Sequence, residues 1–246
     1  MQPELYRAKA RLRADRIRSS RPSQSVLERA HDATRQAREA TKDAYVWVTR
    51  YTKTYNEQWV KQGRPSPFES FPSAKDRPDL PLIFELLASS EPVLWLEKSR
   101  TMMESWAIVA YLTVNAMTVA MRGVVLQCQK EEKARQLIKY VKCLYSQQPQ
   151  WLQDAFPLSK PLHSQSDLSC QWATGGYVVG IPGGADQMRS YHPWAVMNDE
   201  SSFQPDAGEC YNEYLAAGPE KIIFNSSAGP GWFADARHDI VVNSEQ

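Results

Sequence analysis

Two kinds of apolar segment alternate along most of the chain. The runs VLWL, GVVLQCQ, WAVMN and KIIFN are short and rich in β-branched or aromatic residues, which predicts buried strands. Longer segments at about 104–121 and 130–145 predict helices, and in the second the apolar residues recur with the helical period. The run LIFELLAS predicts a further helix, and CQWATGGYVVGIP a hairpin that turns at residues 174–176.

Strands separated by helices predict an α/β fold with a mainly parallel sheet and right-handed crossovers. Ligands of such sheets bind at the carboxyl ends of the strands. Three predicted strands end there in polar groups, namely Lys98-Ser99-Arg100, Asp199-Glu200 and Ser226-Ser227-Ala228. We therefore expect these groups to meet at one edge of the sheet.

The amino-terminal part differs from the rest in charge. Residues 1–60 predict a helical, basic appendage and residues 61–246 the core, with the proline-rich stretch 62–82 connecting them. Seven basic residues crowd positions 7–21, with only Glu4 and Asp15 to compensate. This stretch is either a solvated helix or an arm that contacts nucleic acid phosphates or a partner protein.

Composition limits the class of protein. A chain of 246 residues with net charge +1 and 42% hydrophobic residues fits one soluble globular domain plus the appendage. The four cysteines are scattered without a C-x-x-C pair, which favours buried thiols in a reducing compartment. The longest apolar stretch, Trp106 to Met121, is shorter than the roughly 20 residues that span a bilayer and contains Asn115, so it predicts a core helix. The polar start of the chain argues against secretion.

The strand that ends in Asp199-Glu200 suits metal-assisted hydrolysis of a nucleoside triphosphate. Asp199 would hold Mg²⁺, usually through water, and Glu200 would orient and deprotonate the attacking water. Taken alone, an Asp-Glu pair at a strand end is more often a solvated turn. A phosphate-loop candidate upstream reverses that balance.

This candidate loop follows the run VLWL. It aligns with G-x-x-x-x-G-K-[ST] when Ser105 takes the final position, with Lys98 and Met103 in place of the glycines and Glu104 in place of the lysine. Backbone N–H groups and a helix amino terminus can hold an anion in such a loop whatever the side chains. Lys98 and Arg100 could supply the missing positive charge, and the Ser105 hydroxyl is correctly placed for Mg²⁺.

Four segments in order carry a family resemblance: KSRTMMESW, VVLQCQKEEKARQLI, GIPGGADQMRSYHPWAVMNDESSFQPD and IIFNSSAGPGWF. Together with VTRYTKTYNEQW and PFESFP upstream, they resemble the large subunit of the terminase of tailed bacteriophages, over roughly residues 45–235. In that family they are the deviant Walker A loop, the following strand and helix, the Walker B strand, and the coupling motif. The resemblance implies a P-loop NTPase-like fold of the additional-strand, RecA-like type, flanked by helices.

The resemblance also implies roles for individual residues. The nucleotide-binding positions are Lys98, Ser99, Arg100 and Ser105, and the Mg²⁺ positions are Asp199 and Ser105. The catalytic positions are Glu200, Arg100 and Arg189, and the coupling positions are Ser226, Ser227 and Ala228. For Arg189 a plain salt bridge is the alternative to contact with a phosphate.

The chain departs from the family pattern at several positions. Thr101 and Met103 stand where many members have Gln and Gly. Glu104 would repel a triphosphate unless its carboxylate turns outward. Terminases normally continue into a nuclease domain, whereas 13 residues follow GPGWF, so we expect that domain to be absent from this chain.

The function implied is that of an ATPase in a DNA-packaging motor, which uses ATP and Mg²⁺ to move double-stranded DNA into a procapsid. The implied partners are viral DNA, the portal protein, the small terminase subunit and further copies of the chain in a ring, in the host cytoplasm and transiently on the procapsid. Two alternatives stay open. One is a non-catalytic or truncated assembly or DNA-binding fragment, and the other is a helicase-like translocase, because Walker B followed by Ser-Ser-Ala also fits helicase motifs.

Overall fold

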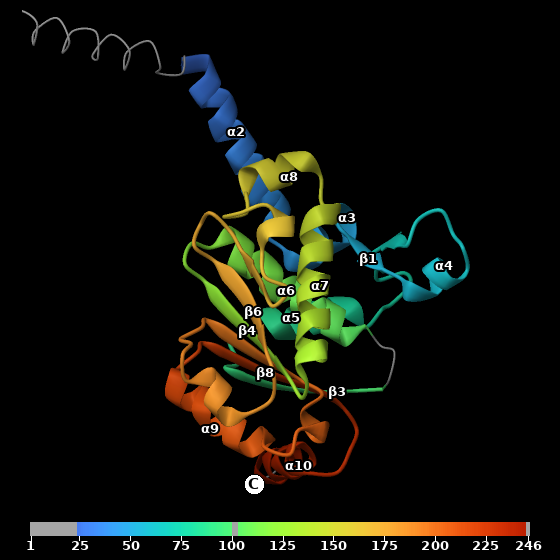
Figure 1. Cartoon of the computed structure of the whole chain (residues 1–246), viewed down its shortest axis with the longest axis vertical. Helices are drawn as coiled ribbons and strands as arrows, with labels where there is room; N and C mark the ends of the chain where they lie inside the picture. Colours follow the sequence, from blue (N-terminus) through green and yellow to red (C-terminus); the bar gives the residue numbers. More distant parts are fainter. Residues whose placement is uncertain (1–23, 100–102, 245–246) are drawn as a thin grey trace, which may run out of the picture.

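The computed structural model describes residues 24–99 and 103–244 (Figure 1). The basic stretch at positions 7–21 and the candidate site residue Arg100 lie outside these ranges. Within them, a six-stranded sheet is covered by helices on both faces, and a small two-stranded sheet lies to one side.

The large sheet has the strand order β3-β8-β7-β4-β6-β5. Its strands are β3 Val93–Lys98, β4 Gly123–Cys128, β5 Ser169–Gln171, β6 Tyr177–Ile181, β7 Ala195–Asp199 and β8 Lys221–Ser227. Every neighbouring pair is parallel except β5 and β6, which form the predicted hairpin. The predicted mainly parallel α/β sheet is therefore confirmed.

Strand β8 lies between β3 and β7, although it follows both in the sequence. Lys98 at the end of β3 is level with Ser227 of β8, and Asn225 of β8 is level with Asp199 at the end of β7. This is the additional strand that the resemblance implied. The carboxyl ends of three strands consequently lie side by side.

Helices divide between the two faces of the sheet (Figure 1). One face is covered by α3 Ala44–Tyr51, α5 Leu80–Ala88, α6 Glu104–Thr118 and α7 Glu131–Gln147, and α2 Gln24–Thr41 and α8 Gln150–Ala155 pack beyond them. The other face is covered by α9 Ala207–Ala217 and α10 Trp232–Ser244. The remaining elements are β1 Lys53–Tyr55, α4 Glu57–Lys61, β2 Phe68–Ser70, and the short 3₁₀ helices η1 Leu162–Ser164, η2 Ala185–Met188 and η3 Ser201–Phe203.

Helix α6 is the centre of the larger core. Residues such as Ile108, Leu112 and Met117 are fully buried, and burial extends round the whole helix, as its unbroken apolar sequence requires. It ends at Thr118, slightly before the predicted end. The prediction of a core helix is confirmed, and none of the described helices is long and apolar enough to cross a membrane.

The described amino-terminal helices share this core. Trp47 and Val48 of α3 are fully buried in the same cluster as α6. The Trp47 indole also donates a hydrogen bond of 3.2 Å to Oε1 of Gln148, which follows α7. The division at residue 60 stays a prediction, but α3 packs as part of the helical layer over the sheet.

Candidate functional site

Lys98 brings together the polar ends of β3 and β7. Its Nζ lies 3.4 Å from Glu200 Oε1 and 3.8 Å from Asp199 Oδ1, and it donates a hydrogen bond of 3.0 Å to Ser105 Oγ at the start of α6. The side chains of Lys98 and Asp199 are only 9% and 12% exposed, so water screens their attraction weakly. We call Lys98, Ser105, Asp199 and Glu200 the edge cluster.

The Ser105 hydroxyl is the shared atom of this cluster. It accepts from Lys98 Nζ and, at 3.1 Å, from Asn225 Nδ2, and it donates to Asp199 Oδ1 at 3.0 Å. A hydroxyl has one donor and two acceptor positions, so all its capacity is used. The arrangement fixes the first turn of α6 against β7 and β8.

Asn225 belongs to the site and was missed by the sequence analysis. It is fully buried, and its side-chain amide donates to both Ser105 and Asp199. Its Oδ1 is buried and has no hydrogen-bond partner within the described ranges. The only signal in the sequence was its place directly before Ser226, at the end of an apolar run.

Asp199 is a buried carboxylate surrounded by donors. Burial raises its pKa, and Lys98 and the hydrogen bonds from Asn225 and Ser105 act in the opposite direction. These donors compensate the carboxylate for the water that it loses on burial.

Glu200 adopts the left-handed backbone conformation, with φ 59° and ψ 43°. This conformation costs a non-glycine residue on the order of 1–2 kcal/mol. Its N–H donates to the Asn225 carbonyl at 2.7 Å. The turn reverses the alternation of a strand, so that Asp199 and Glu200, although adjacent, both reach Lys98.

The serines that end β8 contact the turn after Glu200. Ser226 Oγ accepts a hydrogen bond of 3.0 Å from the Ser202 N–H and donates to the Ser227 carbonyl. Ser226 and Ser227 are buried, whereas Ala228 is exposed. At the end of β3, Ser99 is exposed as well. The proposed coupling segment thus touches the acidic turn directly.

Arg189 lies elsewhere. It follows η2, its side chain is 68% exposed, and its Nη2 is 3.4 Å from Glu213 Oε1 of α9. Within the described ranges it pairs with Glu213 and not with the edge cluster. The geometry corresponds to the salt-bridge alternative.

Glu104, the first residue of α6, does not turn outward. The residue is 8% exposed, and its Oε2 is buried without a hydrogen-bond partner among the residues described. Burial raises its pKa, and the nearby Lys98 opposes this shift. A buried acid thus occupies the position of the usual phosphate-loop lysine.

The donor set fits a magnesium ion. The oxygens of Asp199 and Ser105 lie 3.0 Å apart, which matches the spacing of about 3 Å between adjacent ligands at about 2.1 Å from an octahedral Mg²⁺. Among the described residues no three His, Cys, Asp or Glu side chains cluster to hold a metal. A small number of protein ligands is enough for Mg²⁺, because this ion keeps several of its waters and also binds substrate phosphates.

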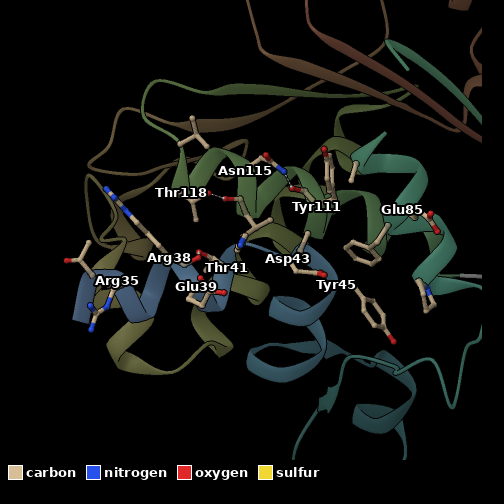
Figure 2. Close-up of a pocket in the computed structure, with 18 of the residues that line it drawn as sticks. Arg35, Arg38, Glu39, Thr41, Asp43, Tyr45, Glu85, Tyr111, Asn115 and Thr118 are labelled. Atoms are coloured by element: carbon tan, nitrogen blue, oxygen red, sulfur yellow. Dashed lines mark hydrogen bonds between the residues drawn. The ribbon is translucent and has the colours of Figure 1, made fainter. Parts of the chain in front are cut away.

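A wide groove lies away from these residues. It has a volume of about 1420 Å³ and runs between α2 and α3 on one side and α5 and α6 on the other (Figure 2). Arg38, Thr41, Tyr45, Tyr111 and Asn115 are among its lining residues. It contains no residue of the edge cluster.

Comparison with known proteins supports the fold. The structure is similar to that of the large terminase of bacteriophage HK97, with 14% sequence identity and a TM-score of 0.55 over 84% of this chain. The chain spans 42% of the length of the HK97 protein. The large terminase ATPase domain of Thermus phage P74-26 also matches, with 13% identity and a TM-score of 0.44, over 68% of this chain and 74% of that domain.

Sequence comparisons find no counterpart. No protein-family profile and no curated protein matches the chain. At 14% identity, the likeness to the HK97 large terminase shows the fold alone, and it confirms the predicted fold class.

Proposed function

We propose that this chain is the ATPase of a viral DNA-packaging motor, which hydrolyses ATP with Mg²⁺ to move double-stranded DNA into a procapsid. The observation that carries the proposal is the edge cluster, in which Lys98 Nζ lies 3.0–3.8 Å from the Ser105 hydroxyl and from the carboxylates of Asp199 and Glu200. The fold shared with the large terminase of bacteriophage HK97 supports it.

Lys98 and the start of α6 would bind the phosphates. The first N–H groups of a helix have no partners within the helix and attract anions. Because the Lys98 side chain is 9% exposed, its charge acts on a phosphate with little screening. Its Nζ, now between Ser105 and two acids, would exchange these contacts for phosphate oxygens.

Asp199 and Ser105 would hold Mg²⁺, which neutralises charge on the phosphates when bound. Glu200 would orient and deprotonate the attacking water. Its side chain is 39% exposed, against 12% for Asp199, so it is the acid with access to solvent.

The motor role extends the proposal to partners. Viral DNA, the portal protein, the small terminase subunit and further copies of this chain in a ring would assemble with it. The site of action would be the host cytoplasm and, transiently, the procapsid.

The test is ATP turnover by the purified chain with Mg²⁺. Glu200→Gln keeps the size of the side chain and removes the base, so turnover should become undetectable. Glu209→Gln, on an exposed glutamate in the first turn of α9, is the matched control and should retain turnover. Full turnover in Glu200→Gln would contradict the role of Glu200.

Glu104 favours a second candidate, a non-catalytic assembly fragment. A buried carboxylate at the start of α6 weakens the attraction of that helix end for phosphates. Calorimetric titration with a non-hydrolysable ATP analogue separates the two. Micromolar binding that Lys98→Met weakens supports the ATPase, whereas no detectable heat supports the fragment.

A further inference from the structure

A closed network of buried polar side chains lies beneath the Glu200 turn. It consists of Gln127 of β4, Asn198 of β7, Gln204 directly after η3, and Tyr214 of α9. None of the four is more than 4% exposed. Buried amides of this kind are costly unless all their donors and acceptors are used.

Asn198 and Gln204 clamp the two ends of the turn. Gln204 Nε2 donates to Asn198 Oδ1 at 2.8 Å, and Asn198 Nδ2 donates back to Gln204 Oε1 at 3.5 Å. The Ser201 hydroxyl adds a bond of 2.9 Å to Asn198 Oδ1. Residues 199–203 are thus enclosed between two side chains that bind each other.

The clamp also holds the peptide bond that precedes Glu200. Gln204 Nε2 donates to the Asp199 carbonyl at 3.0 Å, while the Glu200 N–H donates to the Asn225 carbonyl at 2.7 Å. Both polar groups of this peptide are therefore fixed. A strained left-handed residue persists where its surroundings determine it in this way.

Tyr214 anchors the clamp to the neighbouring strand. Its hydroxyl accepts from Asn198 Nδ2 at 2.7 Å and donates to Gln127 Oε1. Gln127 in turn donates to the carbonyls of Pro182 and Gly184 at 2.8 and 3.0 Å. Every amide hydrogen of Gln127, Asn198 and Gln204 has an acceptor, so the network has one well-defined arrangement.

We infer that Asn198, Gln204 and Tyr214 are positioning residues for Glu200, holding its carboxylate where it can act on the attacking water. The inference rests on the proposed ATP hydrolysis. Among the described residues, none of the three side chains is hydrogen-bonded to Lys98 or Ser105, and their hydrogen bonds reach Glu200 through the backbone of the turn. A loosened turn should slow the chemical step and leave nucleotide binding nearly unchanged.

The test compares Gln204→Leu with Gln148→Leu. Gln148 is also a buried glutamine, 3% exposed and hydrogen-bonded to Trp47, but it lies outside the site. For Gln204→Leu we expect kcat to fall roughly ten- to hundredfold, as small displacements of a catalytic group do, with KM for ATP within about twofold of the wild type. Gln148→Leu should keep both values, although both variants should melt earlier.

Tyr214→Phe is a milder second variant and decides the question if Gln204→Leu does not fold. It removes one hydroxyl, and Tyr145→Phe is its control, because Tyr145 is also a buried tyrosine, 4% exposed, and donates to the Gln153 carbonyl far from the turn. A kcat that is lower in Tyr214→Phe but unchanged in Tyr145→Phe supports the inference. An active wild type with unchanged kcat in Tyr214→Phe overturns it. A wild type without turnover overturns the proposed function, and this inference with it.

Discussion

Two lysines on the adjacent parallel strands β3 and β8 lie at opposite ends of these strands. Lys98 ends β3, and its Nζ faces the Ser105 hydroxyl and the carboxylates of Asp199 and Glu200. Lys221 begins β8, and its Nζ donates hydrogen bonds of 2.8 Å to the carbonyls of Leu87 and Ser89 at the end of α5. Both side chains are largely removed from water.

The partners determine what each lysine does. The carbonyls at a helix end are fixed dipoles without partners in the helix, so Lys221 completes the fold by satisfying them. Around Lys98, by contrast, two carboxylates face one ammonium, which leaves an excess of negative charge. Such an excess is suited to a further cation, and this separates a candidate site from a structural contact.

The largest effect should come from the same substitution made at both lysines. Lys98→Met should lower ATP turnover by roughly a hundredfold, because a preorganised cation near the phosphates is lost. Lys221→Met should leave turnover within about twofold of the wild type, since its contacts are far from the phosphates. Steady-state hydrolysis at a temperature where both variants are folded measures this. Equal losses in the two variants would show that Lys98 is structural too.

A second substitution removes one of the two carboxylates that face Lys98. Asp199→Asn should raise the Mg²⁺ concentration for half-maximal turnover by about tenfold or more, as loss of a metal-site contact does. Asp186→Asn, on an exposed aspartate of η2, is the control. Magnesium titrations of turnover give the answer. An unchanged Mg²⁺ requirement in Asp199→Asn would remove Asp199 from the proposed metal site.

Lys221 should matter for stability instead. Lys221→Met leaves the carbonyls of Leu87 and Ser89 without their donor, at a cost of about 1–3 kcal/mol in the free energy of unfolding. Urea denaturation of the wild type and the variant measures the difference. A variant as stable as the wild type would show that water replaces the ammonium group without cost.

The smallest effect is a dependence on pH. Burial lowers the pKa of Lys221 from its ordinary value of 10.5. Between the lowered value and 10.5 the unfolded chain binds more protons at this residue, so stability rises with pH in that window. The difference in unfolding free energy between wild type and Lys221→Met should therefore grow as pH approaches 10.5, by less than about 1.4 kcal/mol per unit of pKa shift. A shrinking difference would contradict the assigned direction.

The sequence predicted the elements well because their apolar runs are distinct from the polar segments between them. β7 and β8 each contain a continuous apolar run that ends in polar residues, and α7 has a clear helical period. The order of the strands in the sheet could not be predicted from the same apolar pattern. Periodicity does not place β8 between β3 and β7, and only the family resemblance implied it.

The site was predictable where one rule applied. Lys98 and Asp199 meet because the carboxyl ends of parallel strands share an edge. Asn225 and Gln204 were missed because a single amide has neither a spacing nor a period, and its partners are defined only in space. The inward direction of Glu104 was likewise set by packing around α6, which no local pattern records.

The central place of β8 has a consequence for the order of assembly. Val93 of β3 pairs with Ile222 of β8, 129 positions later in the chain. Contacts of such long range form slowly, and a chain under synthesis presents its earlier strands first. The backbone N–H and C=O groups of β3 and β7 that face β8 therefore stay unpaired until β8 has been synthesised. β8 is the last strand of the described chain, and it then inserts between them. Exposed strand edges attract other chains, so this interval is when a newborn copy is most open to aggregation or to capture by a chaperone.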